Sequence, residues 1–154
     1  MTTKAESAEL VLKLYDLRRE KKMRKAREWF ITFYPTSADD YQKTVADPKV
    51  GAYLRMVTSY WEMAAALVNQ GCIDPEVFDA TNGEHYIVFA KIEPILADLR
   101  AANDRPTLFS GLETQINSLP NGPERLRKTQ EFLVKFAARM QASGKDKSAK
   151  ASKG

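Results

Sequence analysis

The chain has 154 residues, of which 44% are hydrophobic and 29% charged, and it carries a net charge of +4. A chain of this length can form one domain that buries roughly 68–70% of its unfolded surface, and this composition favours a folded domain over disorder. The single cysteine, Cys72, excludes an internal disulfide framework and any metal site that needs several cysteines. These totals leave one globular domain as the expectation.

Two helices with a break between them are predicted for the N-terminal segment. Thr3 and Glu6 have the capping-box spacing that begins a helix. Two apolar faces follow, at residues 10–17 and 26–33, and they do not share one helical phase. Because a single straight helix would bury unpaired cations, we predict a break or sharp kink at Arg19–Lys22.

Proline and capping residues mark the next elements. Pro35 should stop the second helix after Tyr34, because the residue before a proline is pushed out of the helical region. Thr36 or Ser37 can then cap a short helix that reaches about Val45.

The stretch around which the chain is organised runs from Ala52 to Gln70. Further aromatic and methionine residues widen an apolar stripe whose members recur at helical spacing. The residues of this stripe are Val50, Leu54, Val57, Trp61, Ala64 and Val68. Asp47-Pro48 is a strong helix start, and Gly71 is placed to close the helix in a left-handed conformation. Since this helix is apolar on most sides, we predict a central buried helix over about 48–70.

Short accessory helices and one last helix complete the prediction. Asp74-Pro75 begins a short helix that ends near Asn82, and Glu84–Ala102 is helical with a kink at Pro94. Two further helices are predicted, at residues 107–118 and 124–142. No stretch alternates with the period of a strand. The predicted fold is therefore all-α: a compact helical bundle at residues 1–142, followed by a disordered, lysine-rich tail at residues 143–154.

Membrane insertion is not expected, although the central helix is nearly long enough to span a bilayer. Arg55 and Glu62 near its centre would each cost about 2.5–3.5 kcal/mol to insert. The N-terminus lacks an apolar signal segment. We therefore expect a cytoplasmic protein.

Three segments combine aromatic and polar positions in a distinctive order: RKAREWF (Arg24–Phe30), AYLRMVTSYWEMAAALVNQGCID (Ala52–Asp74) and GEHYIVFAKIEP (Gly83–Pro94). Together they resemble an uncharacterised bacterial family of small helical proteins, known as a domain of unknown function. The resemblance covers about Leu10 to Arg100. It implies a compact helical bundle from a bacterial source, and it implies no reaction, ligand or catalytic residue.

The residues that most often carry chemistry are isolated in this sequence. Glu84-His85 is the one histidine–acid pair, whereas a di-iron bundle needs two Glu-x-x-His elements and two further carboxylates. Cys72 has no predicted neighbour that would activate it as a nucleophile. We therefore expect no catalytic residue, no metal and no cofactor, and we favour a function other than catalysis.

Two clusters are candidate sites. The first is the polar strip of the central helix, formed by Arg55, Ser59 and Glu62, which could orient a small ligand, fix the register of the bundle or lie at the solvent edge. The second is the basic edge, residues 18–27, in which Lys21, Arg24 and Lys25 fall opposite the apolar face of their helix. With the lysine-rich tail, the basic edge could contact anions, or it could be a solvated helix face.

Three hypotheses follow. The preferred one is a protein–protein interaction or regulatory module that binds an unknown protein partner, or a second copy of itself as a homo-oligomer. It is favoured by the aromatic and methionine residues around the central helix, which exceed what one small core needs. The alternatives are nonspecific binding of nucleic acid or another polyanion through residues 18–27 and the tail, and small-ligand binding by the polar strip.

Overall fold

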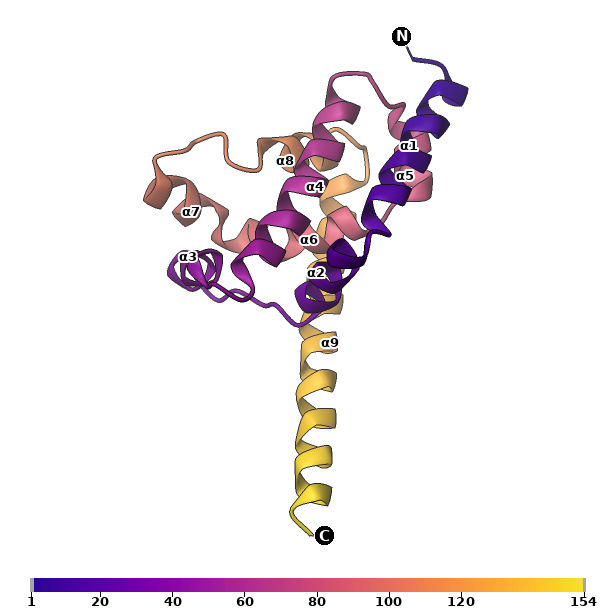
Figure 1. Ribbon diagram of the computed structural model, residues 1–154. Helices are drawn as coiled ribbons and strands as arrows, with labels where there is room; N and C mark the ends of the chain where they lie inside the picture. Colours follow the sequence, from indigo (N-terminus) through magenta and orange to yellow (C-terminus); the bar gives the residue numbers. More distant parts are fainter. Residues whose placement is uncertain (1, 154) are drawn as a thin grey trace.

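The computed structural model describes residues 2–153, and over this range the chain forms helices and no strand (Figure 1). The all-α prediction is confirmed. In chain order the elements are α1 (Lys4–Arg18), α2 (Lys21–Ile31), α3 (Ala38–Ala46), α4 (Gly51–Asn69), α5 (Pro75–Thr81), α6 (Glu84–Ile92), the 3-10 helix η1 (Glu93–Ile95), α7 (Leu96–Asn103), α8 (Ser110–Asn117) and α9 (Gly122–Ala151).

Helix α4 lies at the centre of the bundle and packs against α2, α3, α6 and α8 (Figure 1). Leu54, Val57 and Trp61 on this helix are fully buried. Full burial of one leucine, valine or aromatic side chain contributes about 1.5–3 kcal/mol, so α4 supplies a large part of the core. The prediction of a central buried helix is confirmed.

The start of α4 is three residues later than Pro48. The carboxylate of Asp47 accepts hydrogen bonds from the backbone N–H groups of Lys49 and Val50, at 2.7 and 3.0 Å, and so caps a turn that precedes the helix. Gly51 then packs directly on the end of α3, where an added Cβ would lie 2.2 Å from the Val45 carbonyl oxygen. Asp47 is therefore a cap, as predicted, but it caps this turn and not the first turn of α4.

The predicted break between the first two helices is present and has a clear local cause. Glu20 is the N-cap of α2, and its carboxylate accepts hydrogen bonds from the N–H groups of Lys22 and Met23, at 3.0 and 2.9 Å. The capping box of Thr3 and Glu6 at the start of α1 is also present. Both helices therefore begin with their first N–H groups paired.

The second helix ends at Ile31, three residues before the predicted end at Tyr34. The ammonium group of Lys91, on α6, donates hydrogen bonds to the carbonyls of Phe30 and Ile31, at 2.7 and 3.2 Å. Lys91 is buried, and its Nζ also lies 4.1 Å from the ring centre of Tyr34. A cation placed on the last carbonyls of a helix is stabilised by the helix dipole, so Lys91 fastens α6 to the end of α2.

Pro94 divides the long helical segment, as predicted. The chain passes from α6 through the 3-10 turn η1 into α7, because proline offers no N–H and its ring crowds the preceding turn. The change of direction carries α7 toward α3, on the other side of the bundle (Figure 1).

Helix α9 differs most from the prediction. It begins against the bundle, with Leu126 and Leu133 buried, and then leaves the body as a straight helix that continues to Ala151 (Figure 1). Residues 143–151, predicted to be disordered, are helical and exposed. Alanine and lysine favour helix, no proline intervenes, and extending a formed helix needs no new nucleation. The low apolar content of this segment predicted its lack of packing correctly, but not its conformation.

Among the helices described over residues 2–153, none combines the length and apolar character needed to cross a membrane.

Candidate functional site

The polar strip lies on the side of α4 that the bundle leaves most open. Arg55 and Ser59 are exposed, and Glu62 is half-buried. The Nη1 atom of Arg55 donates a hydrogen bond to the Val45 carbonyl at 2.9 Å, and the Ser59 hydroxyl donates to the Arg55 carbonyl at 2.5 Å. Arg55 thus ties α4 to the C-terminus of α3 while the rest of its guanidinium faces solvent.

Glu62 closes the N-terminus of α8. Its two carboxylate oxygens accept hydrogen bonds from the backbone N–H groups of Gly111 and Leu112, at 2.7 and 2.9 Å. Phe109, which occupies the N-cap position, makes no side-chain cap hydrogen bond, so Glu62 performs that role from another helix. A carboxylate at this end is also favoured by the helix dipole.

The polar strip lines a groove of about 680 Å³ between α3, α4 and the loop that joins α7 to α8. We call it the polar groove. Besides Thr58 of α4, its walls include residues that the sequence does not connect with the strip: Tyr41, Gln42, Val45, Asn103, Arg105, Thr107, Leu108 and Phe109. These residues come from two other segments, and no spacing pattern in the sequence indicates that they meet α4.

The basic edge is divided between internal and exposed cations. Arg27 forms an ion pair with Glu84 at 2.6 Å, and Glu84 also accepts a hydrogen bond from the indole N–H of Trp61 at 3.2 Å. These contacts join α2, α4 and α6. Lys21 and Arg24, like Lys25 beside them, are exposed and form no ion pair with any other residue between 2 and 153.

A second groove, of about 610 Å³, opens beside the basic edge. We call it the methionine groove, and its lining residues come from α1, α4, and the start of α2: Leu17, Glu20, Met23, Met56, Ser59, Tyr60 and Met63. Leu17 is 57% exposed and Met63 43% exposed, although both are large apolar side chains. The hydroxyl of Tyr60 donates a hydrogen bond to the Leu14 carbonyl.

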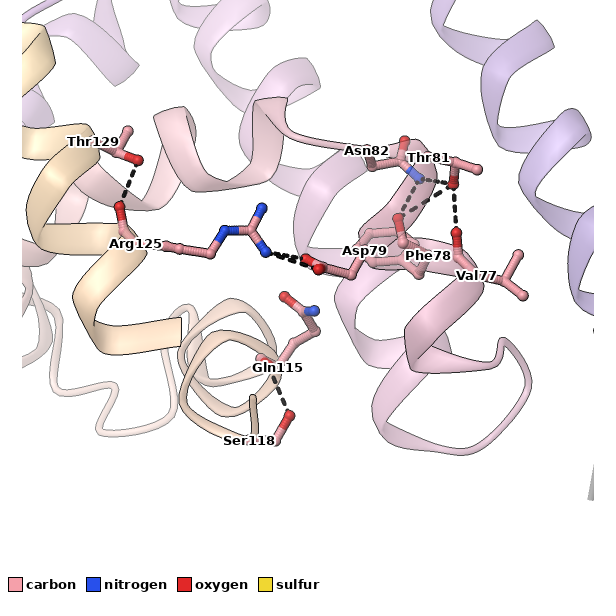
Figure 2. Close-up of polar contacts among 9 residues, drawn as sticks. All are labelled: Val77, Phe78, Asp79, Thr81, Asn82, Gln115, Ser118, Arg125 and Thr129. Atoms are coloured by element: carbon pink, nitrogen blue, oxygen red, sulfur yellow. Dashed lines mark hydrogen bonds and ion pairs between the residues drawn. The ribbon is translucent and has the colours of Figure 1, made fainter. Parts of the chain in front are cut away.

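A third group of polar side chains lies where α5, α6, α8 and α9 approach one another, with Gln115 buried and Asp79 and Arg125 half-buried. Arg125 of α9 reaches across to Asp79 of α5, and its Nη1 donates to both carboxylate oxygens, at 2.6 and 2.8 Å (Figure 2). The same guanidinium lies 4.3 Å from the ring centre of Tyr86. Gln115 extends toward this pair, yet its side-chain amide has no hydrogen-bond partner among the described residues (Figure 2).

His85 is fully buried beside this group and is surrounded by aromatic rings. Its ring centre lies 4.9 Å from that of Phe78 and 4.7 Å from that of Tyr86. Neither ring nitrogen has a hydrogen-bond partner in the described part of the chain. Burial lowers the pKa of His85 to about 4, with Asp79 opposing and Arg125 adding to this shift. A neutral histidine in such a place fills the core.

The remaining residues with reactive side chains do not assemble. Cys72 is half-buried just after the turn that ends α4. Across residues 2–153, no group of three histidine, cysteine, aspartate or glutamate side chains is placed to hold a metal ion. The candidate residues predicted from the sequence lie in the polar groove and on the basic edge, which the methionine groove adjoins.

The family model described as Domain of unknown function (DUF4760) matches residues 3–119. The chain belongs to this family. No curated protein and no solved structure matches it.

The DUF4760 match is longer than the resemblance seen in the sequence, which ended near Arg100. It includes α8 and therefore both ends of the contact between Glu62 and Gly111. Both grooves also lie within the matched DUF4760 residues, whereas α9 lies outside them.

Proposed function

We propose that this protein is a non-enzymatic interaction module, and that it binds a partner protein in the methionine groove. The observation that carries this proposal is the exposure of Leu17 and Met63 in a groove lined mainly by apolar side chains. Exposed apolar surface of this kind marks interaction sites, and methionine adapts its shape to a partner at low cost.

The charges beside the methionine groove specify the partner further. The segment from Arg18 to Lys25 holds six basic residues, in three pairs that are separated by the groove residues Glu20 and Met23. Lys21 and Arg24 are exposed beside it. The complementary partner is an amphipathic helix that places apolar residues in the groove and acidic residues along the basic edge.

Photo-crosslinking in cells tests this proposal. We would place p-benzoylphenylalanine at Met63 and, as the matched control, at Asp98, which is exposed on the opposite part of the bundle. The expected result is one dominant protein adduct at position 63, absent at position 98 and weakened when Lys21 and Arg24 are both changed to glutamate. The same adducts at both positions, or none at position 63, would contradict the proposal.

A second copy of the chain is the other partner the sequence suggests. Light scattering of the purified protein, coupled to size exclusion, distinguishes the two cases. A dimer that Leu17→Glu converts to a monomer would assign the methionine groove to self-association, whereas a monomer leaves it to another protein.

Nucleic acid or another polyanion is a second candidate ligand, and a specific observation favours it. Lys21, Arg24 and Lys25 are exposed, and residues 143–154 hold four more lysines, three of them on the exposed end of α9. Binding of a labelled DNA duplex, measured by anisotropy at several salt concentrations, should weaken steeply with salt. Deleting residues 143–154 should flatten that dependence, by about 0.9 in logarithmic slope for each lost phosphate contact. Absence of binding at low salt would remove this candidate.

The bacterial source and the cytoplasmic location stay predictions. We propose both on the grounds given by the sequence, and localisation of a fluorescent fusion in a bacterial host would test the second.

A further inference from the structure

The polar groove has the size and composition of a small-molecule site, and it is separate from the methionine groove. Its volume of about 680 Å³ falls within the range of roughly 300–1,000 Å³ that ligand pockets occupy. Tyr41 and Phe109 are buried beneath it and pack edge to face, with ring centres 6.4 Å apart. An apolar, aromatic base of this kind suits a planar ligand body.

The hydrogen-bonding groups that remain free in the groove are mostly donors. The carboxylate of Glu62 is already engaged by two backbone N–H groups, and its single charge is outnumbered by the guanidinium groups of Arg55 and Arg105 in the same lining. Arg55 uses one nitrogen on the Val45 carbonyl and keeps its other donors. The side chain of Arg105 makes no hydrogen bond or ion pair with residues 2–153.

Burial also keeps the groove's phenol neutral. The pKa of Tyr41 is raised to about 12, because burial disfavours the phenolate. The Tyr41 hydroxyl therefore stays a hydrogen-bond donor at ordinary pH, and two guanidinium groups are the exposed charges left on the walls of the groove.

The backbone of the α7–α8 loop, which forms one wall, is held in an unusual conformation. Asp104 and Phe109 are the two non-glycine residues of the described chain with positive φ, at 50° and 58°. For phenylalanine this conformation is strained, and such strain tends to be kept at ligand sites. Here it places Phe109 under the groove, while Gly111, two residues further along the chain, meets Glu62.

We propose that the polar groove binds a small organic anion, a carboxylate or phosphate held between Arg55 and Arg105 with an aromatic or other planar body resting on Tyr41 and Phe109. The inference goes beyond the proposed interaction module and does not depend on it, because the two grooves have different walls and share only Ser59.

Phenyl phosphate is the probe, and chemical-shift mapping of the ¹⁵N-labelled protein is the measurement. Saturable shifts are expected for amides near residues 55–62 and 103–112, with a Kd of about 1 mM, as is reasonable for so small a ligand. Inorganic phosphate lacks the planar body and benzyl alcohol lacks the charge, so each should bind at least ten-fold more weakly. Benzoate should bind like phenyl phosphate if the charge alone is recognised, and more weakly if the site is built for phosphate.

Two variants separate this site from the other cations. Arg105→Gln should weaken phenyl phosphate binding about ten-fold, and Lys25→Gln, an exposed cation on the basic edge, should leave it unchanged. Thermal unfolding of Arg105→Gln within 2 °C of the parent protein would show that it is folded, and Arg55→Gln gives a second variant. Shifts that map to residues 18–27, equal binding of benzyl alcohol, or no saturable shift at 10 mM would overturn the proposal.

Discussion

The Oε1 atom of Glu62 accepts a hydrogen bond from the backbone N–H of Gly111 at 2.7 Å, across a separation of 49 residues. This contact fixes α8 to the central helix and forms one end of the polar groove. It also makes two positions interdependent, because an added Cβ at Gly111 would lie 2.7 Å from that same oxygen.

Removing the Glu62 carboxylate should show how much this cap contributes to the free energy of unfolding. Glu62→Ala should lower the free energy of unfolding by about 1–2 kcal/mol, because two N–H groups at the start of α8 lose their partners. Chemical denaturation measures the change. Glu76→Ala is the matched control, since its ion pair with Lys4 is exposed and its loss should change stability much less. Equal effects of the two substitutions would show that Glu62 does not act as a cap.

A side chain at position 111 should act through Glu62. Gly111→Ala should destabilise the fold by about 1–3 kcal/mol, because the new methyl group displaces the carboxylate from α8. In the Glu62→Ala background the same change should cost much less, so the two effects will not add. Gly83→Ala, where a Cβ meets nothing within 4 Å, is the control. Additive effects in this double-mutant cycle would contradict the coupling.

His85 should make the protein less stable in mild acid. It is neutral in the folded protein down to a pKa of about 4, whereas the unfolded chain takes up the proton near pH 6.5. Between these values the unfolded chain binds more protons. The free energy of unfolding should therefore fall as the pH drops from 6.5 toward 4, by up to about 3 kcal/mol, and be unaffected by this group above 6.5.

Denaturation at several pH values, compared with a His85→Leu variant, isolates this contribution from that of the carboxylates. The difference between the two proteins should grow as the pH falls through the window. A difference that stays constant from pH 7 to pH 4 would mean that His85 does not titrate with the lowered pKa.

The ion pair between Asp79 and Arg125 should matter more than its partial exposure suggests. Arg125→Met should cost about 1–2 kcal/mol, since it leaves a half-buried carboxylate unpaired and removes the guanidinium from the face of Tyr86. Arg127→Met, which breaks an exposed pair with Glu131 one turn away, should change stability by less than about 0.5 kcal/mol. Thermal or urea unfolding of both variants checks the contrast.

Elements with local signals could be predicted from the sequence. The capping box at Thr3, the left-handed Gly71 and the interruption at Pro94 each depend on a few neighbouring residues, and each is present. The burial of Leu54, Val57 and Trp61 followed from periodicity alone.

Contacts between distant segments could not be predicted. Nothing near Glu62 indicates that it meets Gly111, and nothing near Lys91 indicates that it reaches the end of α2. Likewise, the sequence indicates the polar strip as a candidate site, but it does not indicate that Arg105 and Tyr41 lie beside it, because that depends on the tertiary fold. The low hydrophobicity of residues 143–151 indicates only that they do not pack, whereas their helical conformation follows from helix propensity and from the helix that precedes them.

The position of Lys91 has a chemical consequence for the whole bundle. Burial lowers the pKa of its ammonium to about 8, so at neutral pH a larger fraction of this side chain is the unprotonated, nucleophilic amine than for an exposed lysine, yet the fold shields it. Acylating reagents should modify the surface lysines first and reach this one when α2 and α6 separate. The rate at which Lys91 is labelled would then report how often the core opens between α2 and α6.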